Sequence, residues 1–313
     1  MSKLDLQSKL NRKNVISDII GNTSSYEIKE VSPEILMPFG NTPGFPFKLH
    51  QGKKREELKQ SIIEKGITSP IVVRAIPDAY KHIRPDCDYE IIIGHNRNDI
   101  ALELKLPIVP IIIRKDISDD VTAIGIMNED NFLQRNEILP SEKAKAYKMQ
   151  VDAISKQGKR TDLSSNGTEV NTSRDEVAKN NKISASQIQR YIRLNFLTDK
   201  LLNMVDKNIL SFRPAVELSH LSMESQQIIE SLIENQEIKV REKQAKKLKE
   251  LEENEGSLDF KTIFQILSEK KKPKKKIEIP YEKINAYFNN DASDEEIINR
   301  IISLLEGGEY DER

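Results

Sequence analysis

Short apolar runs and helically spaced apolar residues alternate along the first part of the chain. Ile71–Val73, Ile91–Ile93 and Pro107–Arg114 have the unbroken apolar character of buried strands. Lys53–Lys65 has the i, i+4 spacing of a helix and is followed by a glycine that acts as a stop signal. Strand, helix, strand, helix and strand within about ninety residues predict one compact α/β domain.

The ends of this segment carry further structural signals. Tyr26–Ile28 is expected to form an edge strand, and the loop Pro38–Lys48 follows it. Pro110 lacks a backbone N–H, which predicts an edge position or a bulge in its strand. Ser118 is expected to cap a helix that runs towards Met127. From about residue 141 onward, strand signals almost vanish and the apolar residues adopt helical spacing.

Two capping boxes stand close together in this second part. Ser173–Glu176 and Ser184–Gln187 each predict the start of a short helix, and two helices joined by a few residues form a helix-turn-helix. Ile188 and Ile192 are expected to point inward. Gln and Arg side chains pair with adenine and guanine edges in the major groove. The residues expected to face DNA are Ser173, Arg174, Ser184, Ser186, Gln187, Gln189, Arg190 and Arg193.

The local charge agrees with this interpretation. The whole chain has a formal net charge of −1, so it is not basic overall. Residues 141–196 nevertheless contain eleven Lys and Arg against six Asp and Glu, an excess of five positive charges. The alternative is a helical hairpin with a solvated polar face, and the charge excess favours DNA binding over it.

The composition excludes several classes of protein and site. Cys87 is the single cysteine, which excludes an internal disulfide framework and a cysteine-based zinc site, and the four histidines share no metal-ligand spacing. The N-terminus shows no apolar segment of the signal-peptide kind, and no run approaches the roughly 18 apolar residues of a membrane span. We therefore expect a cytoplasmic protein that does not enter a membrane.

A strand, a glycine turn and a helix occupy Tyr89–Ala101. Gly94 permits a sharp turn, and the first helical turn after it presents His95, Asn96 and Arg97. Because a helix N-terminus offers unpaired N–H groups, an anion could dock there and Arg97 could clamp it. From spacing alone, an anion cradle and an ordinary helix start remain equally acceptable.

The C-terminal third is strongly charged. Lys239–Glu253 is expected to be a solvent-exposed helix, and Glu269–Lys276, with six lysines, a linker. Beyond it, Ile277–Ile279 is expected as a strand and Tyr281–Phe288 as a helix. A third capping box at Ser293–Glu296 opens an amphipathic helix that should dock on the chain or on a second subunit.

The order of these motifs resembles the ParB family of partition proteins, particularly its plasmid and mobile-element branch in low-GC Gram-positive bacteria. The resemblance covers roughly Tyr26–Glu234. It rests on Ile71–Val73, Gly94–Arg97, Pro107–Ile113, Asn131–Arg135, Ile138–Ala144 and the helix-turn-helix that follows them.

The resemblance implies an α+β fold with a small ParB-like α/β nucleotide-binding domain, an all-α helix-turn-helix DNA-binding domain and a small, mostly helical C-terminal unit. The expected boundaries are 1–25 for a flexible arm, 26–136 for the ParB-like domain, 137–235 for the helix-turn-helix domain, 236–276 for a charged helix and Lys-rich linker, and 277–313 for a dimerisation or docking unit.

The resemblance also implies CTP and magnesium as ligands of the first domain. Carried over by position, the nucleotide-binding residues are Gly94, His95, Asn96, Arg97, Asn131, Gln134 and Arg135, and Glu129 is the metal ligand. Two positions depart from the family pattern. Asn96 stands where the first of two arginines is common, and Asn131-Phe132 stands in place of Glu-Asn. Hydrolysis of CTP is therefore left open, and any enzymatic activity would be that of a slow CTP hydrolase.

Three functions follow as hypotheses. The first is a partition protein that binds a centromere-like site in double-stranded DNA as a dimer, switches a clamp with CTP and meets a ParA-type ATPase through its basic N-terminal arm. The second is an operator-binding regulator or nucleoid-associated protein without nucleotide switching. The third is an enzyme on the related sulfiredoxin-like fold, which is disfavoured because Cys87 lies outside the His95-Asn96 box.

Overall fold

The structure is a computed structural model that describes residues 26–39, 45–158, 172–236, 238–269 and 293–306, together with residues 280, 283, 287 and 288. The chain divides into two compact units, Met1–Ser268 and Glu269–Arg313. The expected N-terminal arm, the strand at 277–279 and most of the Lys-rich linker and of the helix at 281–288 lie outside the described residues.

Five strands form one mixed sheet in the order β1-β5-β3-β4-β2. The neighbours β1 and β5 run antiparallel, as do β3 and β4, whereas β5 runs parallel to β3 and β2 parallel to β4. The edge strand expected from Tyr26–Ile28 is confirmed as β1. The bounds are β1 (Tyr26–Val31), β2 (Leu36–Met37), β3 (Ile71–Ala75), β4 (Tyr89–Ile93) and β5 (Val109–Arg114).

The position expected for Pro110 is wrong. Its strand, β5, lies between β1 and β3, and the sheet's irregularity falls between Val72 and Val73 of β3. Pro110 is paired with Glu30 of β1, while the pairing with β3 begins only at Ile111. The proline is tolerated because no β3 residue is paired with it, so its missing N–H breaks no bond of that ladder.

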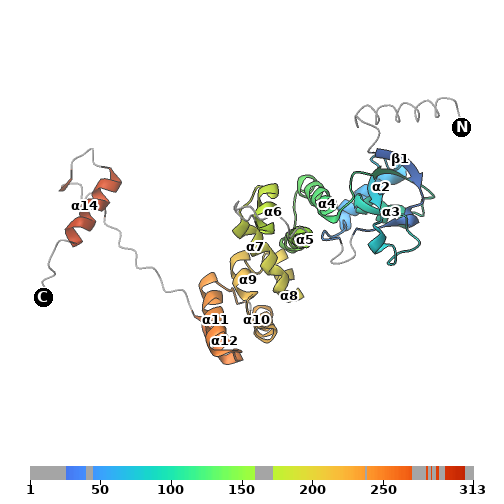
Figure 1. The fold of residues 1–313 in the computed structure, drawn as a ribbon. Coiled ribbons are helices and arrows are strands. Elements are labelled where there is room, and N and C mark those ends of the chain that lie inside the picture. The colour runs from blue at the N-terminus through green and yellow to red at the C-terminus, as the bar shows by residue number, and fades with distance from the viewer. Residues whose placement is uncertain are drawn as a thin grey trace. The chain divides into compact units, whose positions relative to one another are not determined.

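Helices cover both faces of the sheet. Successive strand residues point to opposite faces, so Ile91 and Ile92 of β4 belong to different layers. Ile91 packs in one cluster with Ala101 of α3, and Ile92 packs in another with Met127 of α4. The helices of this part are α2 (Gly52–Lys65), α3 (His95–Glu103) and α4 (Asp120–Gln134), and the short 3-10 turns are η1 (Pro33–Ile35) and η2 (Asp78–Tyr80) (Figure 1).

Helix α4 begins one residue later and extends further than the sequence predicts. Its cap is Asp119, not Ser118, and the Asp119 carboxylate accepts the backbone N–H of Thr122 at 2.9 Å. The helix continues past Met127 to Gln134. The extension matters because it places the second predicted nucleotide-binding segment at the C-terminal end of a helix.

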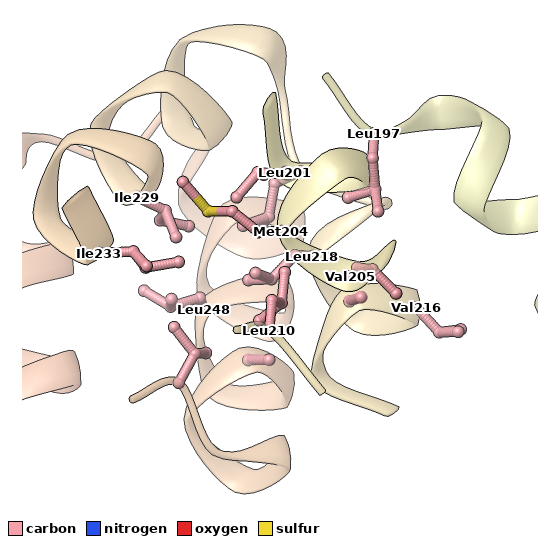
Figure 2. Packing of buried hydrophobic residues seen from close by; sticks show 14 of the residues in the cluster. Leu197, Leu201, Met204, Val205, Leu210, Val216, Leu218, Ile229, Ile233 and Leu248 are labelled. Carbon is pink, nitrogen blue, oxygen red and sulfur yellow. The ribbon is translucent and has the colours of Figure 1, made fainter. Parts of the chain in front are cut away.

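Beyond α4, the regular elements in the described residues of the first unit are all helices. Its helices are α5 (Pro140–Gly158), α6 (Ser173–Asn181), α7 (Ala185–Arg193), η3 (Leu194–Phe196), α8 (Asp199–Asp206), α9 (Phe212–Leu218), α10 (Met223–Gln236), α11 (Glu242–Glu255) and α12 (Phe260–Ser268). Helices α8 to α12 pack around one apolar cluster, in which Leu201, Leu218 and Ile229 are fully buried (Figure 2).

Helix α11 is not the solvent-exposed helix that its charge predicts. Ala245 and Leu248 have no exposed surface, and Leu248 lies within the apolar cluster drawn in Figure 2. Lysines and glutamates occupy the rest of the helix circumference, as Lys243 and Glu250 do. A narrow apolar stripe is enough to bury one side of a helix. A count of the charged residues in the helix does not detect such a stripe.

The second unit contains α14 (Asp294–Glu306), and the third capping box is confirmed. Ser293 N donates to the Glu296 carboxylate at 2.9 Å, and Glu296 N donates to the Ser293 hydroxyl at 3.3 Å. Ile298 and Leu304 are exposed on this helix. Across the described part of the chain, no helix has both the length and the apolar character needed to span a bilayer.

Candidate functional site

The turn at Gly94 leaves the start of α3 open. Gly94 has φ 109° and ψ 20°, a backbone conformation that L side chains rarely adopt, and no side chain caps the helix. Arg97 N donates to Gly94 O at 2.9 Å, whereas the first backbone N–H groups, those of His95 and Asn96, have no acceptor within the helix. Such a helix start can receive an anion.

Arg97 folds back over this turn. Its guanidinium donates to the carbonyl oxygens of Ser69 and Pro70, the latter at 2.8 Å, just before β3. A Cβ at Gly94 would lie only 3.1 Å from Arg97 Nη2. Glycine is therefore favoured at this position for two reasons. It adopts the positive φ without strain, and it leaves room for the Arg97 guanidinium.

His95 and Asn96 contact the segments on either side of residues 40–44. His95 is buried, its Nε2 accepts the backbone N–H of Phe39 at 3.1 Å, and its ring stacks on Phe45 at 3.7 Å between centroids. Asn96 Oδ1 accepts the backbone N–H of His50 at 2.7 Å. Burial, together with the charge of Arg135, lowers the pKa of His95 to about 3, so the imidazole is neutral.

The C-terminal end of α4 brings the second predicted segment to the same region. Asn131 donates to Met127 O at 2.8 Å and accepts from Arg135 Nε at 2.9 Å, so it orients the arginine. Gln134 is exposed and donates to Asp130 Oδ1 at 3.1 Å. Arg135 also donates to the carbonyl oxygen of Lys48 at 3.0 Å.

Electrostatics connect the two segments. Burial lowers the pKa of both Arg97 and Arg135, and the charge of Asp130 opposes that shift in each case. Burial raises the pKa of Asp130, with both arginines opposing it. Two partly desolvated guanidinium groups thus lie beside an open helix start, and Asp130 interacts with both of them.

The magnesium ligand predicted at Glu129 has little structural support. Glu129 is exposed on α4, one residue away from the carboxylate that interacts with the arginines. Within the described residues, no three His, Cys, Asp or Glu side chains gather closely enough to hold a metal ion.

The predicted helix-turn-helix is present as α6 and α7, with one cap shifted. The N-cap of α6 is Thr172, which forms a reciprocal capping box with Asp175, so the predicted box at Ser173 and Glu176 is wrong by one residue. Ser173 lies inside the helix, and its hydroxyl accepts a hydrogen bond from that of Ser155 at 2.9 Å. The cap at Ser184 is confirmed, since its side chain accepts the backbone N–H of Gln187.

The polar face of α7 is divided between solvent and internal contacts. Ser186 and Arg190 are exposed, while Gln189 accepts from Arg174 of α6 at 2.7 Å. Arg193 is not free, because it donates to the hydroxyl and the carbonyl oxygen of Ser219. On the opposite face, Ile188 is fully buried and Ile192 is partly buried, as expected.

An open groove of about 560 Å³ runs beside this face. It is lined from α6 and α7 by Arg174, Ser186, Gln189, Arg190 and Arg193, and its other side includes His220 and Lys249. Burial lowers the pKa of His220, and the charges of Arg193 and Lys249 act in the same direction. A groove bordered by several basic side chains suits a polyanion.

A series of aromatic rings extends from the first site to the second. His95 stacks on Phe45, and neighbouring ring centroids in the rest of the series lie 4.8 to 5.9 Å apart. The series runs through Phe45, Phe47, Phe132, Tyr147, Tyr191 and Phe212. Aromatic pairs at these separations attract one another, so the rings pack continuously from the start of α3 to α7 and α9.

Comparison with known proteins points to one family. Residues 20–130 match the family model of the ParB N-terminal domain. A nucleoid occlusion protein of Listeria innocua is 31% identical over 175 residues, which cover 56% of this chain and 52% of that protein. Stage 0 sporulation protein J of Bacillus subtilis is 25% identical over 303 residues, covering 90% and 92%. The chromosome-partitioning protein ParB of Caulobacter vibrioides is 30% identical over 172 residues, covering 54% and 51%.

The matched region of this chain spans about half the length of the Listeria innocua and Caulobacter proteins. Among solved structures, a C-terminally truncated ParB of Caulobacter crescentus bound to the centromeric parS site gives a TM-score of 0.39 at 21% identity, covering 71% of this chain and 98% of that one. The same protein with CTP-gamma-S gives 0.28 at 24% identity, covering 66% and 99%. At TM-scores this low, neither likeness decides anything about this chain.

Proposed function

Because this chain belongs to the ParB family, we propose that it is a sequence-specific DNA-binding partition protein. It binds a centromere-like site in double-stranded DNA as a dimer, and α7 is its recognition helix. The observation that carries this proposal is the face of α7, where Ser186 and Arg190 are exposed beside a groove with basic borders. A helix-turn-helix reads DNA by placing its second helix in the major groove.

Substitutions on α7 test the DNA-binding part. Arg190→Ala and Gln187→Ala should each weaken binding to the specific site by about 1–3 kcal/mol if they contact base edges. Lys261→Ala on α12 is the control, because it removes a positive charge from an exposed position outside α6 and α7. Binding would be measured by fluorescence anisotropy at fixed salt on a site selected from random duplexes. Undiminished specific binding by both α7 variants would refute the assignment.

The second part of the proposal is that the start of α3 binds the triphosphate of CTP. Support comes from the open N–H groups after Gly94 and from the two desolvated guanidinium groups of Arg97 and Arg135. His95 and Asn96 contribute by holding the neighbouring loop rather than by offering free side chains. Any magnesium would enter with the phosphates, as it commonly does. Hydrolysis is not part of the proposal.

Nucleotide titration tests this site. Arg97→Ala should reduce CTP affinity at least about tenfold, since a charged hydrogen-bond donor to phosphate is lost. Arg84→Ala is the matched control, because Arg84 is exposed and paired with Asp86. Calorimetry with and without the DNA site on one sample would report both activities. Negligible CTP binding by both the wild type and Arg97→Ala would refute the cradle.

A second candidate function is that of a nucleoid-associated protein on the same scaffold. It is favoured by one observation, that several similar proteins are called nucleoid occlusion proteins. The two functions differ in their partners, because a partition protein meets a ParA-type ATPase. We place that contact in the N-terminal arm, residues 1–25, which lies outside the described residues. Stimulation of a ParA-type ATPase by the full chain, lost when residues 1–25 are removed, would separate them.

A further inference from the structure

Glu142 is a buried carboxylate at the start of α5 that contacts three separate parts of the chain. Its side chain is 4% exposed. Its Oε1 accepts the backbone N–H of Lys48 at 2.7 Å and Nη1 of Arg135 at 3.3 Å. Its Oε2 accepts the backbone N–H of Leu139 at 2.8 Å, ahead of α5. Burial of a charge with so many partners fixes the carboxylate in one position.

Arg135 is held by this carboxylate and by its own surroundings. Its guanidinium lies over the Phe47 ring at 5.2 Å and donates to Asn131 and to the carbonyl oxygen of Lys48. Burial lowers the pKa of Arg135, and the charge of Glu142 is the largest influence that opposes this. Glu142 therefore supplies the negative charge that the arginine requires in the absence of a ligand.

The charges around the start of α3 are balanced. Two guanidinium groups, on Arg97 and Arg135, face the carboxylates of Asp130 and Glu142. A phosphate group that entered beside them would add negative charge to a set whose positive members already have partners. The binding free energy of the phosphate is then reduced by the free energy that separating Arg135 from Glu142 requires.

We propose that Glu142 is a positioning residue that occupies Arg135 in place of a ligand phosphate, so that a phosphate-bearing ligand at the start of α3 competes with Glu142 for this guanidinium. The inference rests on the proposed nucleotide site and names a determinant of its affinity. The competition also affects the helical part. Glu142 holds Lys48 N, and Lys48 Nζ reaches Asp206 of α8 at 3.1 Å.

Asp206 completes the connection. Its side chain is 5% exposed and accepts the backbone N–H and the hydroxyl of Ser141 at 3.0 and 2.7 Å. The loop at Lys48, the first turn of α5 and the last turn of α8 therefore meet at two neighbouring carboxylates. Only Glu142 of these two contacts Arg135, which gives the test a matched control.

Glu142→Gln is the first variant, because it keeps the size of the side chain and an oxygen acceptor while it removes the charge. CTP should bind this variant about three- to tenfold more tightly than the wild type, since the competing anion is gone. Inorganic triphosphate should show the same gain, because the competition concerns phosphate. Glu142→Asp keeps the negative charge on a shorter side chain. The affinity of this variant for CTP should lie between those of the wild type and Glu142→Gln.

Two controls separate competition from a loosened structure. Asp206→Asn removes an equally buried carboxylate from the same connection and should change triphosphate affinity less than about twofold. In an Arg135→Gln background, Glu142→Gln should also change it less than about twofold, because the contested guanidinium is absent. Circular dichroism would establish that each variant is folded. Equal gains in Glu142→Gln and Asp206→Asn would overturn the proposal.

The two ligands distinguish failure of this inference from failure of the proposed function. Triphosphate binding that improves in Glu142→Gln, without any CTP binding, would support the competition and refute CTP as the ligand. If the wild type binds CTP and neither Glu142 variant binds it more tightly, the nucleotide site would be supported and the competition refuted. Absence of binding of either ligand to every variant would overturn both.

Discussion

Gly94 has the most restrictive backbone position of the first site. An alanine there would have to adopt φ near 109° and would push its Cβ to 3.1 Å from Arg97. We expect Gly94→Ala to lower the free energy of unfolding by about 1–3 kcal/mol, the typical cost of such strain. Urea unfolding followed by circular dichroism measures this difference.

Gly125 is the control within the same domain. It lies in α4 with an ordinary φ, and an added Cβ would meet no atom within 4 Å. Gly125→Ala should stabilise the protein by up to about 1 kcal/mol, because alanine is the better helix former. Equal effects of the two substitutions would contradict the role assigned to Gly94.

His95 should make stability depend on pH. Its folded-state pKa is lowered to about 3 by burial, whereas the unfolded chain takes up a proton near pH 6.5. Between these values the unfolded state binds more protons. The contribution of His95 is therefore complete above about pH 6.5 and falls by up to about 1.4 kcal/mol per pH unit below it.

His95→Gln isolates this contribution, because a glutamine oxygen can accept the Phe39 N–H without titrating. Between pH 7 and pH 5 the wild type should lose about 2 kcal/mol more unfolding free energy than the variant. Urea titrations at both pH values measure this difference. Parallel losses in the two proteins would show that the imidazole is not held neutral.

Single residues were predicted from the sequence to different degrees. The glycine turn at Gly94 and the helix start that carries Arg97 could be predicted, because a glycine between a strand and a helix is a local pattern. The side-chain contacts of His95 and Asn96 could not, since their partners Phe39 and His50 lie 56 and 46 residues away. The role of Glu142 could not be predicted for the same reason. In the sequence it is an ordinary acidic residue in the first turn of a helix, and its contacts with Lys48 and Arg135 are formed only by the fold.

At the scale of elements, α11 offers the clearest test. Leu248 is fully buried among the helices that follow α7, although the sequence around it is mostly Lys and Glu. Leu248→Ala should lower the unfolding free energy by about 2–5 kcal/mol, the range for a buried leucine. Glu250→Ala, at an exposed position of the same helix, should change it by no more than about 0.5 kcal/mol. Similar values for the two variants would mean that α11 is not packed.

Most elements of the sheet and the helical part could be predicted, because their apolar spacing repeats over several turns or residues. The errors fall where local signals compete. Ser118 and Asp119 can both cap a helix, as can Thr172 and Ser173, and only the surrounding structure selects one. The position of Pro110 depended on which strands became its neighbours, and strand order cannot be read from one strand alone.

At the scale of the molecule, the order of motifs was a better guide than any one of them. It predicted a small α/β part followed by a helical part, and the structure contains a five-stranded sheet followed by helices. It did not reveal that α11 and α12 share a core with α8 to α10. The sequence predicted a charged helix and linker here because Lys and Glu dominate the composition. The few leucines and isoleucines that form the shared core are recognised only by their spacing.

The aromatic series has a practical consequence for optical spectroscopy. The chain contains eight tyrosines and no tryptophan, so its intrinsic emission has no indole component. Phe132 stands in the middle of the series, between Phe47 on the side of α3 and Tyr147 on the side of α7. A tryptophan at this position would be the single indole of the protein, and its emission maximum would respond to repacking that begins at either end.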